Sequence, residues 1–197
     1  MSRTPMKATA CPENGHNFIP KELPSNKDVN GISRTVFTHV SNLHGLLLDW
    51  VRVQSKGTKI CRSISSLKLY DCDDGYYPQA MQPLAESLLD AADSLKNINE
   101  GVSIVNRQLQ AMARLQPGDD PVISTWSASQ ISRTASEIHL AIDKEYKLKY
   151  IITENIAHCR DENLIEVYVS SWEFNLYLDL EGNASYLFAE VGLPPVT

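Results

Sequence analysis

An uninterrupted ladder of apolar residues between Met81 and Met112 most limits what this chain can fold into. Its members follow alternating steps of three and four: Met81, Leu84, Leu88, Ala91, Leu95, Ile98, Val102, Val105, Leu109 and Met112. This spacing places all of them in one stripe on a helix with about 3.5 residues per turn. Such a helix of roughly 34 residues is about 50 Å long. It must therefore lie against another long helix, in the same chain or in a partner.

The positions that flank this stripe indicate how many helices pack together. A dimeric zipper carries Glu and Lys at these positions, where they form ion pairs between two helices. Here the flanking residues are small or uncharged: Ala85, Ala92, Asn99 and Asn106 on one side, and Ser87, Ser94, Gly101 and Gln108 on the other. Such flanks widen the packing surface and favour a bundle of three or four helices.

The residues before the ladder predict a tail followed by the first long helix. Residues 1–30 contain four prolines and little periodic apolar content, which predicts a disordered N-terminal tail. From Ile32 the pattern is helical, and after Trp50 its phase slips by one step. The predicted stripe is Val36, Val40, Leu43, Leu47, Trp50, Val53, Gly57, Ile60, Ile64 and Leu67. Turn-forming residues at 71–78 then make 31–116 a long antiparallel, coiled-coil-like hairpin.

The second half of the chain predicts another helical pair. Residues 116–121 contain two prolines and a glycine, which end the ladder helix. A helix is predicted from Ser127 to His158, and Asp161 can cap a fourth helix that carries Trp172. A last short helix is predicted at 186–191. We therefore expect an all-α protein with a tail at 1–30, the hairpin at 31–116 and a C-terminal helical region at 123–193.

Charge and composition exclude several classes of function. The formal net charge is −6, so the chain lacks the basic surface typical of direct nucleic-acid binding. Its four cysteines are scattered and form no CxxC pair, which indicates neither a zinc site nor a disulfide framework. No stretch approaches 18 apolar residues. We expect a soluble intracellular protein in a reducing compartment, with no membrane partner.

Motifs for catalysis, cofactors and metals are absent from the sequence. It contains no GxGxxG, phosphate loop, GxSxG, HExxH or DxDxDG pattern. His158 and Cys159 are adjacent, but neighbouring residues on a helix point about 100° apart, so a nucleophile pair is disfavoured. We expect no catalytic residue, no cofactor and no metal, and therefore no enzyme.

Aromatic residues are the candidates for contacts with partners. Trp50 belongs to the predicted stripe and is expected in the core. Trp126 precedes the third helix, where it packs at the helix entrance or anchors a partner. Trp172 and Tyr177 flank the end of the fourth helix, and both core and interface roles stay open because Trp and Tyr dominate interface hot spots. Leu89 and Ile104 lie beside the main stripe, facing either a further helix or a partner.

Two short motifs in the tail point to kinases. Thr4 precedes Pro5 and lies near Lys7, which is the pattern of a proline-directed phosphorylation site. Phosphorylation there would add about −1.5 to −2 charge. Lys21-Glu22-Leu23 fits a basic-x-leucine pattern for docking to a cyclin. Both patterns are short enough to arise by chance.

Two blocks of the chain resemble the cyclin-dependent kinase 2-interacting protein family. The first contains His44-Gly45-Leu46-Leu47-Leu48-Asp49-Trp50, followed by Gly57, Ile64 and Leu67-Lys68-Leu69. The second contains Thr125-Trp126, Ile156-Ala157-His158, Asp161, Tyr168-Val169-Ser170-Ser171-Trp172, Tyr177 and Glu190-x-Gly192. The Trp-to-Tyr spacing and the Ala-His end of the helix are the most specific elements. The candidate interface residues are therefore Trp126, His158, Trp172 and Tyr177.

The resemblance implies a non-catalytic adaptor that is nuclear, with an additional cytoplasmic pool. It implies a subunit of an AAA ATPase complex, with a small helical co-subunit, that acts in DNA replication and in large ribosomal subunit maturation. The alternative is a linker between cyclin-dependent and Cdc7-type kinases at replication origins and in DNA damage checkpoint signalling during the cell cycle. The periodicity alone supports only a helical interaction protein.

Overall fold

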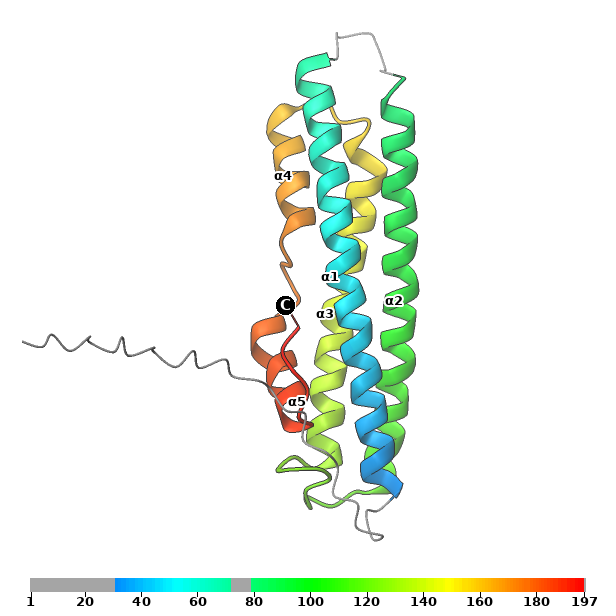
Figure 1. Cartoon of the computed structure of the whole chain (residues 1–197), viewed down its shortest axis with the longest axis vertical. Helices are drawn as coiled ribbons and strands as arrows, with labels where there is room; N and C mark the ends of the chain where they lie inside the picture. Colours follow the sequence, from blue (N-terminus) through cyan, green and yellow to red (C-terminus); the bar gives the residue numbers. More distant parts are fainter. Residues whose placement is uncertain (1–30, 72–78, 197) are drawn as a thin grey trace, which may run out of the picture.

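The computed structural model describes residues 31–71 and 79–196, which form long helices packed side by side (Figure 1). The elements are α1 (Gly31–Asp71), α2 (Met81–Leu115), α3 (Ala128–Ile156), α4 (Glu162–Glu173), the π-helical turn η1 (Leu180–Ala184) and α5 (Ser185–Glu190). The described ranges contain no β-strand, and only an isolated bridge joins Pro121 to Ser127. The prediction of an all-α protein is confirmed, whereas the tail predicted at 1–30 lies outside the described residues.

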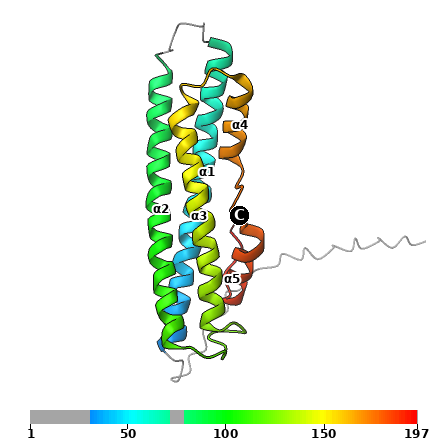
Figure 2. The same cartoon turned by 180° about the vertical axis from the view of Figure 1, so that it is seen from behind.

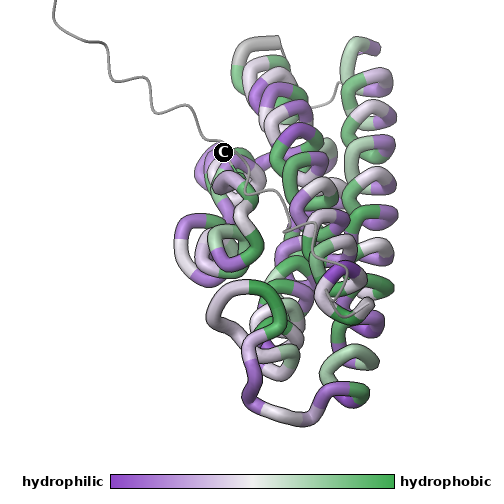
Figure 3. Tube along the Cα trace, turned by 60° about the horizontal axis from the view of Figure 1, so that its bottom comes forward, coloured by the Kyte–Doolittle hydropathy of each residue, from purple (hydrophilic) through white to green (hydrophobic). Residues whose placement is uncertain are grey.

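The long helices alternate in direction, and the short C-terminal elements complete a fourth column. α1 and α2 form the predicted antiparallel hairpin, α3 returns alongside it, and α4, η1 and α5 follow one another down the side of α1 and α3 (Figures 1 and 2). Buried residues from α1, α2, α3, α4 and α5 belong to one apolar cluster. Apolar and polar residues alternate along each long helix (Figure 3), as expected for helices with one face in a core. The two predicted helical pairs therefore share one core.

The apolar ladder lies on the buried face of α2. All its members are buried except Leu84 and Met112, which are half-buried. Two flanking residues, Ala92 and Asn106, are buried as well, because both α1 and α3 pack against α2. The small flanking residues therefore widen the contact surface of α2, as predicted, so that two neighbouring helices can pack against it.

Local signals set the ends of the helices. Ser127 caps α3 in a capping box with Gln130, whose side chain accepts a hydrogen bond from the Ser127 N–H at 2.8 Å. The Asp161 carboxylate caps α4 by accepting from the backbone N–H groups of Asn163 and Leu164. α3 ends at Ile156, two residues before the predicted end at His158. The last helix, predicted at 186–191, lies at Ser185–Glu190.

The second half of α1 differs from the predicted stripe. Val53, Ile60 and Leu67 are only half-buried, whereas Gln54 and Cys61 are buried. A single heptad stripe is the pattern of a helix with one packing partner. In the structure α1 packs against both α2 and α4, so its buried surface turns toward the fourth column as well.

Candidate protein interface

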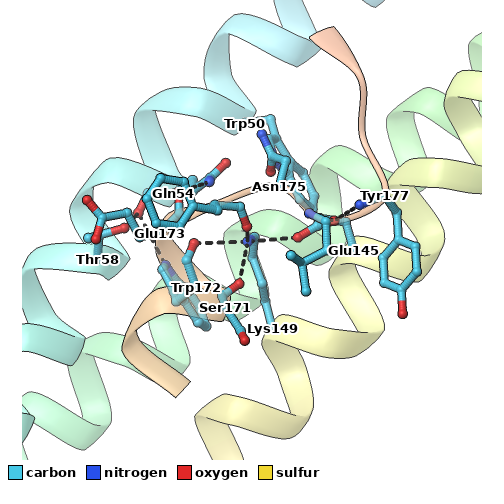
Figure 4. A network of polar contacts seen from close by, with 12 residues as sticks. Trp50, Gln54, Thr58, Glu145, Lys149, Ser171, Trp172, Glu173, Asn175 and Tyr177 are labelled. Carbon is cyan, nitrogen blue, oxygen red and sulfur yellow. Dashed lines mark hydrogen bonds and ion pairs between the residues drawn. The ribbon is translucent and has the colours of Figure 1, made fainter. Parts of the chain in front are cut away.

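The segment between α4 and η1, residues 174–179, is the most unusual part of the fold, and we call it the connector. It is not helical, yet its backbone is held by two charged side chains of α3 (Figure 4). Lys149 Nζ donates hydrogen bonds to the carbonyl oxygens of Trp172 at 2.9 Å and of Ser171 and Phe174 at 3.4 Å. A helix C-terminus leaves such carbonyls without partners. The lysine therefore caps α4 with a positive charge, at the end where the helix dipole favours one.

The carboxylate of Glu145 completes this arrangement one turn earlier on α3. Its Oε1 lies 3.0 Å from Lys149 Nζ, and both side chains are 0% exposed. Its Oε2 accepts from the backbone N–H groups of Leu176 at 3.0 Å and Tyr177 at 2.9 Å. Burial lowers the pKa of Lys149, and the charge of Glu145 opposes that shift. The ion pair thus binds the connector on both sides, through carbonyls and through amides.

Contacts with α1 hold the last two residues of α4, just before the connector (Figure 4). Gln54 Nε2 donates to the Glu173 carbonyl at 2.6 Å, and Trp172 Nε1 donates to the Gln54 carbonyl at 3.2 Å. Arg62 pairs with the Glu173 carboxylate at 2.6 Å. The connector backbone is therefore bound to α3, and α1 fixes the residues that precede it and also donates from Trp50 Nε1 to Asn175 Oδ1 at 3.4 Å.

Three large side chains project from this fixed backbone into solvent. Phe174 is 61% exposed, Leu176 is 60% exposed and Tyr177 is 51% exposed. The Tyr177 ring also lies 5.8 Å from Lys144 Nζ of α3, within the range of a cation–π contact. A rigid backbone that presents exposed aromatic and aliphatic side chains loses little entropy on binding, which is the property of an interface hot spot. We call these three side chains the connector surface.

A second carboxylate, Glu190 at the end of α5, fixes the loop before α3. Its Oε1 accepts from the backbone N–H groups of Ser124 at 3.0 Å and Trp126 at 2.8 Å, and also from that of Thr125. The Thr125 hydroxyl donates to Oε2 at 2.7 Å. Burial alone would raise the pKa of Glu190, but these hydrogen bonds outweigh it and lower the pKa below its ordinary value. This contact secures the lower end of the fourth column, as the ion pair secures its middle.

The structure separates most of the residues that the sequence singled out. Trp172 is 0% exposed, so of its two alternatives the structure places it in the core, where it cannot contact a partner. Tyr177 lies on the connector surface. Trp126 is half-buried at the start of α3, and His158 is exposed just beyond the other end of that helix. Trp172 and Tyr177 are linked through their backbone groups to the same Lys149–Glu145 pair, and Thr4 lies outside the described residues.

Sequence reasoning missed the buried ion pair, although the pattern contained a signal for it. Ile142, Glu145, Lys149 and Ile152 follow steps of three, four and three, so two charges occupy positions that heptad spacing assigns to the core. All four are buried. Paired opposite charges at i and i+4 on a core stripe are the signature of a buried ion pair.

Several residues that carry the family resemblance are contacts of the fourth column. A Cβ on Gly57 would overlap the indole ring of Trp172, so α1 approaches α4 at a glycine. The His44 ring packs edge-on against Phe188 at 4.8 Å, and its Nε2 lies 3.0 Å from the Pro194 carbonyl oxygen. Thr125 and Trp126 bind Glu190, as described above. The resemblance therefore reflects how α4 and α5 dock on the long helices.

The described ranges show neither a metal-binding cluster nor a membrane-spanning helix. Residues 31–71 and 79–196 contain no group of three or more His, Cys, Asp or Glu side chains placed to hold a metal ion. None of the helices in the described part of the chain is long and apolar enough to cross a membrane.

Comparison with known proteins supports the suspected family relationship at low identity. No family model matches the chain. It is 20% identical over 174 residues to the cyclin-dependent kinase 2-interacting protein of Bos taurus, covering 75% of this chain and 82% of the relative. For the protein of the same name in Mus musculus, identity is 23% over 177 residues, with 75% and 82% covered. For that of Xenopus laevis, identity is 21% over 178 residues, with 79% and 86% covered.

Proposed function

We propose that the chain is a non-catalytic adaptor that binds a cyclin-dependent kinase through the connector surface. The observation that carries the proposal is the rigid display of Phe174, Leu176 and Tyr177 on a backbone clamped by a buried ion pair. The partner is suggested by the name of three relatives, cyclin-dependent kinase 2-interacting protein. Exposed apolar groups on a rigid support are typical of a protein contact.

The non-catalytic part of the proposal is supported by how the reactive groups are used. The buried lysine, Lys149, is a type of residue that enzymes use as base or nucleophile. Here its ammonium is directed at Glu145 and at backbone carbonyls, and its side chain is 0% exposed. A substrate cannot reach this group, so its role is structural.

Binding to a purified complex of cyclin-dependent kinase 2 and a cyclin tests the proposal. The variant with Phe174→Ala and Tyr177→Ala should bind at least about tenfold more weakly than the unchanged chain, because it loses the centre of the surface. The matched control carries Leu89→Ala and Ile104→Ala, which remove similar apolar groups, 48% and 49% exposed, from α2. It also tests the partner contact that the sequence left open for these two residues. The control should bind normally. Equal loss in both variants, or no binding by the unchanged chain, would reject the proposal.

A finer proposal comes from the family resemblance: a nuclear adaptor subunit of an AAA ATPase complex in replication and large ribosomal subunit maturation. In cell extract the endogenous protein should then elute with AAA ATPases at a mass far above its own 22.0 kDa. Elution as a lone monomer would contradict this role. A chain excluded from nuclei in fractionated cells would contradict the nuclear location.

A further inference from the structure

We propose that a groove along the solvent side of α1 binds an acidic, extended segment of a protein partner, at a site separate from the connector surface. The groove has a volume of about 630 Å³ and lies between α1, the connector and the C-terminal residues. Val51, Leu180 and Val196 are among the residues that line it. Its volume is within the range of ligand-binding clefts, about 300–1,000 Å³.

A second hollow extends this groove along α1. It is lined by Leu48, Arg52 and Lys56, and shares Val51, Ser55 and Lys59 with the first. The two hollows therefore adjoin along α1 between Val51 and Lys59. A peptide in an extended conformation fits such a long and open shape better than a compact metabolite does.

Charge indicates the chemistry of the occupant. The groove and its extension are lined by four cations, Arg52, Lys56, Lys59 and Arg62, on a chain whose formal net charge is −6. Arg52 pairs with Asp49 at 2.8 Å and Arg62 pairs with Glu173 at 2.6 Å. These pairs leave Lys56 and Lys59 as the available charges.

Lys56 and Lys59 are exposed and make no ion pair with any residue of 31–71 or 79–196. They are three residues apart, on the same side of α1. Two acids also line the groove: Glu173, which pairs with Arg62, and Glu181 of η1, which forms no ion pair with either lysine. Two unpaired ammonium groups beside an apolar floor are complementary to a segment that carries both carboxylates and aliphatic side chains.

Other occupants fit these features less well. Nucleic acid requires a dense positive surface, and the overall charge of −6 would repel its phosphates. Residues 1–30 of this chain carry four Lys and Arg against three Asp and Glu, so they are not acidic. The partner segment is therefore expected to come from another protein.

Fluorescence anisotropy on the full chain tests this inference. The probe is a labelled peptide in which Glu and Leu alternate, and its counterpart has Gln in place of every Glu. The Glu peptide should bind at least about tenfold more tightly than the Gln peptide. Its binding should weaken as salt rises from about 0.05 M to about 0.5 M, because the charges are exposed.

Two variants with the same change in charge locate the site. Lys56→Glu with Lys59→Glu should weaken binding of the Glu peptide at least about tenfold, whereas Lys96→Glu with Arg107→Glu, at exposed positions of α2, should leave it unchanged. Equal loss in both variants, or equal binding of the two peptides, would overturn the inference. Tighter binding of single-stranded DNA would reassign the groove to nucleic acid. A dimer in sedimentation that only the α1 variant dissociates would reassign it to a second copy.

The outcome is separable from that of the proposed function. The connector variant, Phe174→Ala with Tyr177→Ala, should still bind the Glu peptide with unchanged affinity, because neither residue lines the groove. Loss of kinase binding with retained peptide binding would reject neither proposal. Failure of the peptide alone would remove only the inference about the groove.

Discussion

Replacing Lys149 with Met should destabilise the fold far more than replacing any surface lysine. The variant leaves Glu145 as a buried carboxylate without its cation, and it leaves the Trp172 carbonyl without its 2.9 Å donor. Removing one partner of a buried ion pair costs about 3–5 kcal/mol. Since domains have total free energies of unfolding of about 5–15 kcal/mol, this single change should remove a large share of the stability.

Lys147→Met is a control on the same helix. Lys147 forms an ion pair with Asp143 at the same i, i+4 spacing, at 2.6 Å, but its side chain is 68% exposed. Water screens such a pair, so its loss should change the free energy of unfolding by less than about 1 kcal/mol. Urea unfolding followed by circular dichroism at neutral pH compares the two variants. Similar midpoints for both variants would refute the claim that burial makes the Lys149 pair strong.

A double variant separates the unpaired charge from the lost hydrogen bonds. Lys149→Met combined with Glu145→Gln removes both charges and keeps an amide oxygen that can accept from the connector. It should be more stable than Lys149→Met alone, because no unpaired charge stays buried. A double variant with a lower free energy of unfolding than Lys149→Met alone would show that the unpaired buried charge is not what destabilises the single variant.

The pH dependence of unfolding provides an independent measure of the same lysine. Burial lowers its pKa from the ordinary value of 10.5, so between the lowered pKa and 10.5 the unfolded chain binds more protons than the folded one. The free energy of unfolding contributed by Lys149 therefore rises with pH across that window. Lys149→Met should abolish this rise, and an unchanged slope in the variant would contradict the assignment.

Three further predictions concern the packing and the ends of the fourth column. Gly57→Ala should destabilise the fold by roughly 1–3 kcal/mol in thermal melts, because its Cβ would overlap the Trp172 ring. Gly45→Ala is the control: its Cβ would meet no atom within 4 Å, so the variant should be as stable as the unchanged chain or more stable. Glu190→Gln should lower stability at neutral pH by about 1–3 kcal/mol. The folded chain lowers the pKa of Glu190 below its ordinary value of 4.5. The difference in stability between the variant and the unchanged chain should therefore shrink as the pH falls from 4.5 toward the lowered pKa, and unfolding midpoints measured at a series of acidic pH values would show this. Burial raises the pKa of the Cys61 thiol to about 12, so iodoacetamide should modify Cys61 only in urea. Modification of Cys61 itself in the folded chain, located by peptide mapping, would show that α1 is not packed as described.

The fold was largely predictable because its strongest signals are periodic and local. The ladder on α2 defines a buried stripe over its whole length, and the caps Ser127 and Asp161 act within one turn of their helices. The second half of α1 was harder, because a helix with two packing partners has a wider buried surface than one heptad stripe. Its partner α4 lies about a hundred residues away along the chain, and no local pattern reports that contact.

The candidate interface was less predictable for the same reason. Tyr177 could be proposed as an interface residue from its residue type. The contacts that fix its backbone, however, come from Lys149 and Glu145, which bind backbone N–H and carbonyl groups. Every residue type has these groups, so the sequence does not reveal the contacts. For Trp172 the residue type does not decide between the two roles, since a large aromatic side chain suits an interface as well as a core. Only the close approach of Gly57 decides that it is buried.

The way Glu145 holds the connector has a consequence for the time scale of its motions. Surface segments without helical hydrogen bonds normally exchange their amide hydrogens with water within seconds, because nothing occupies the N–H groups. The amides of Leu176 and Tyr177 are instead bound to a carboxylate that is 0% exposed, although their own side chains lie in solvent. These two amides can exchange only when the column detaches from α3, so they should report the opening of the bundle as slowly as residues of its interior do.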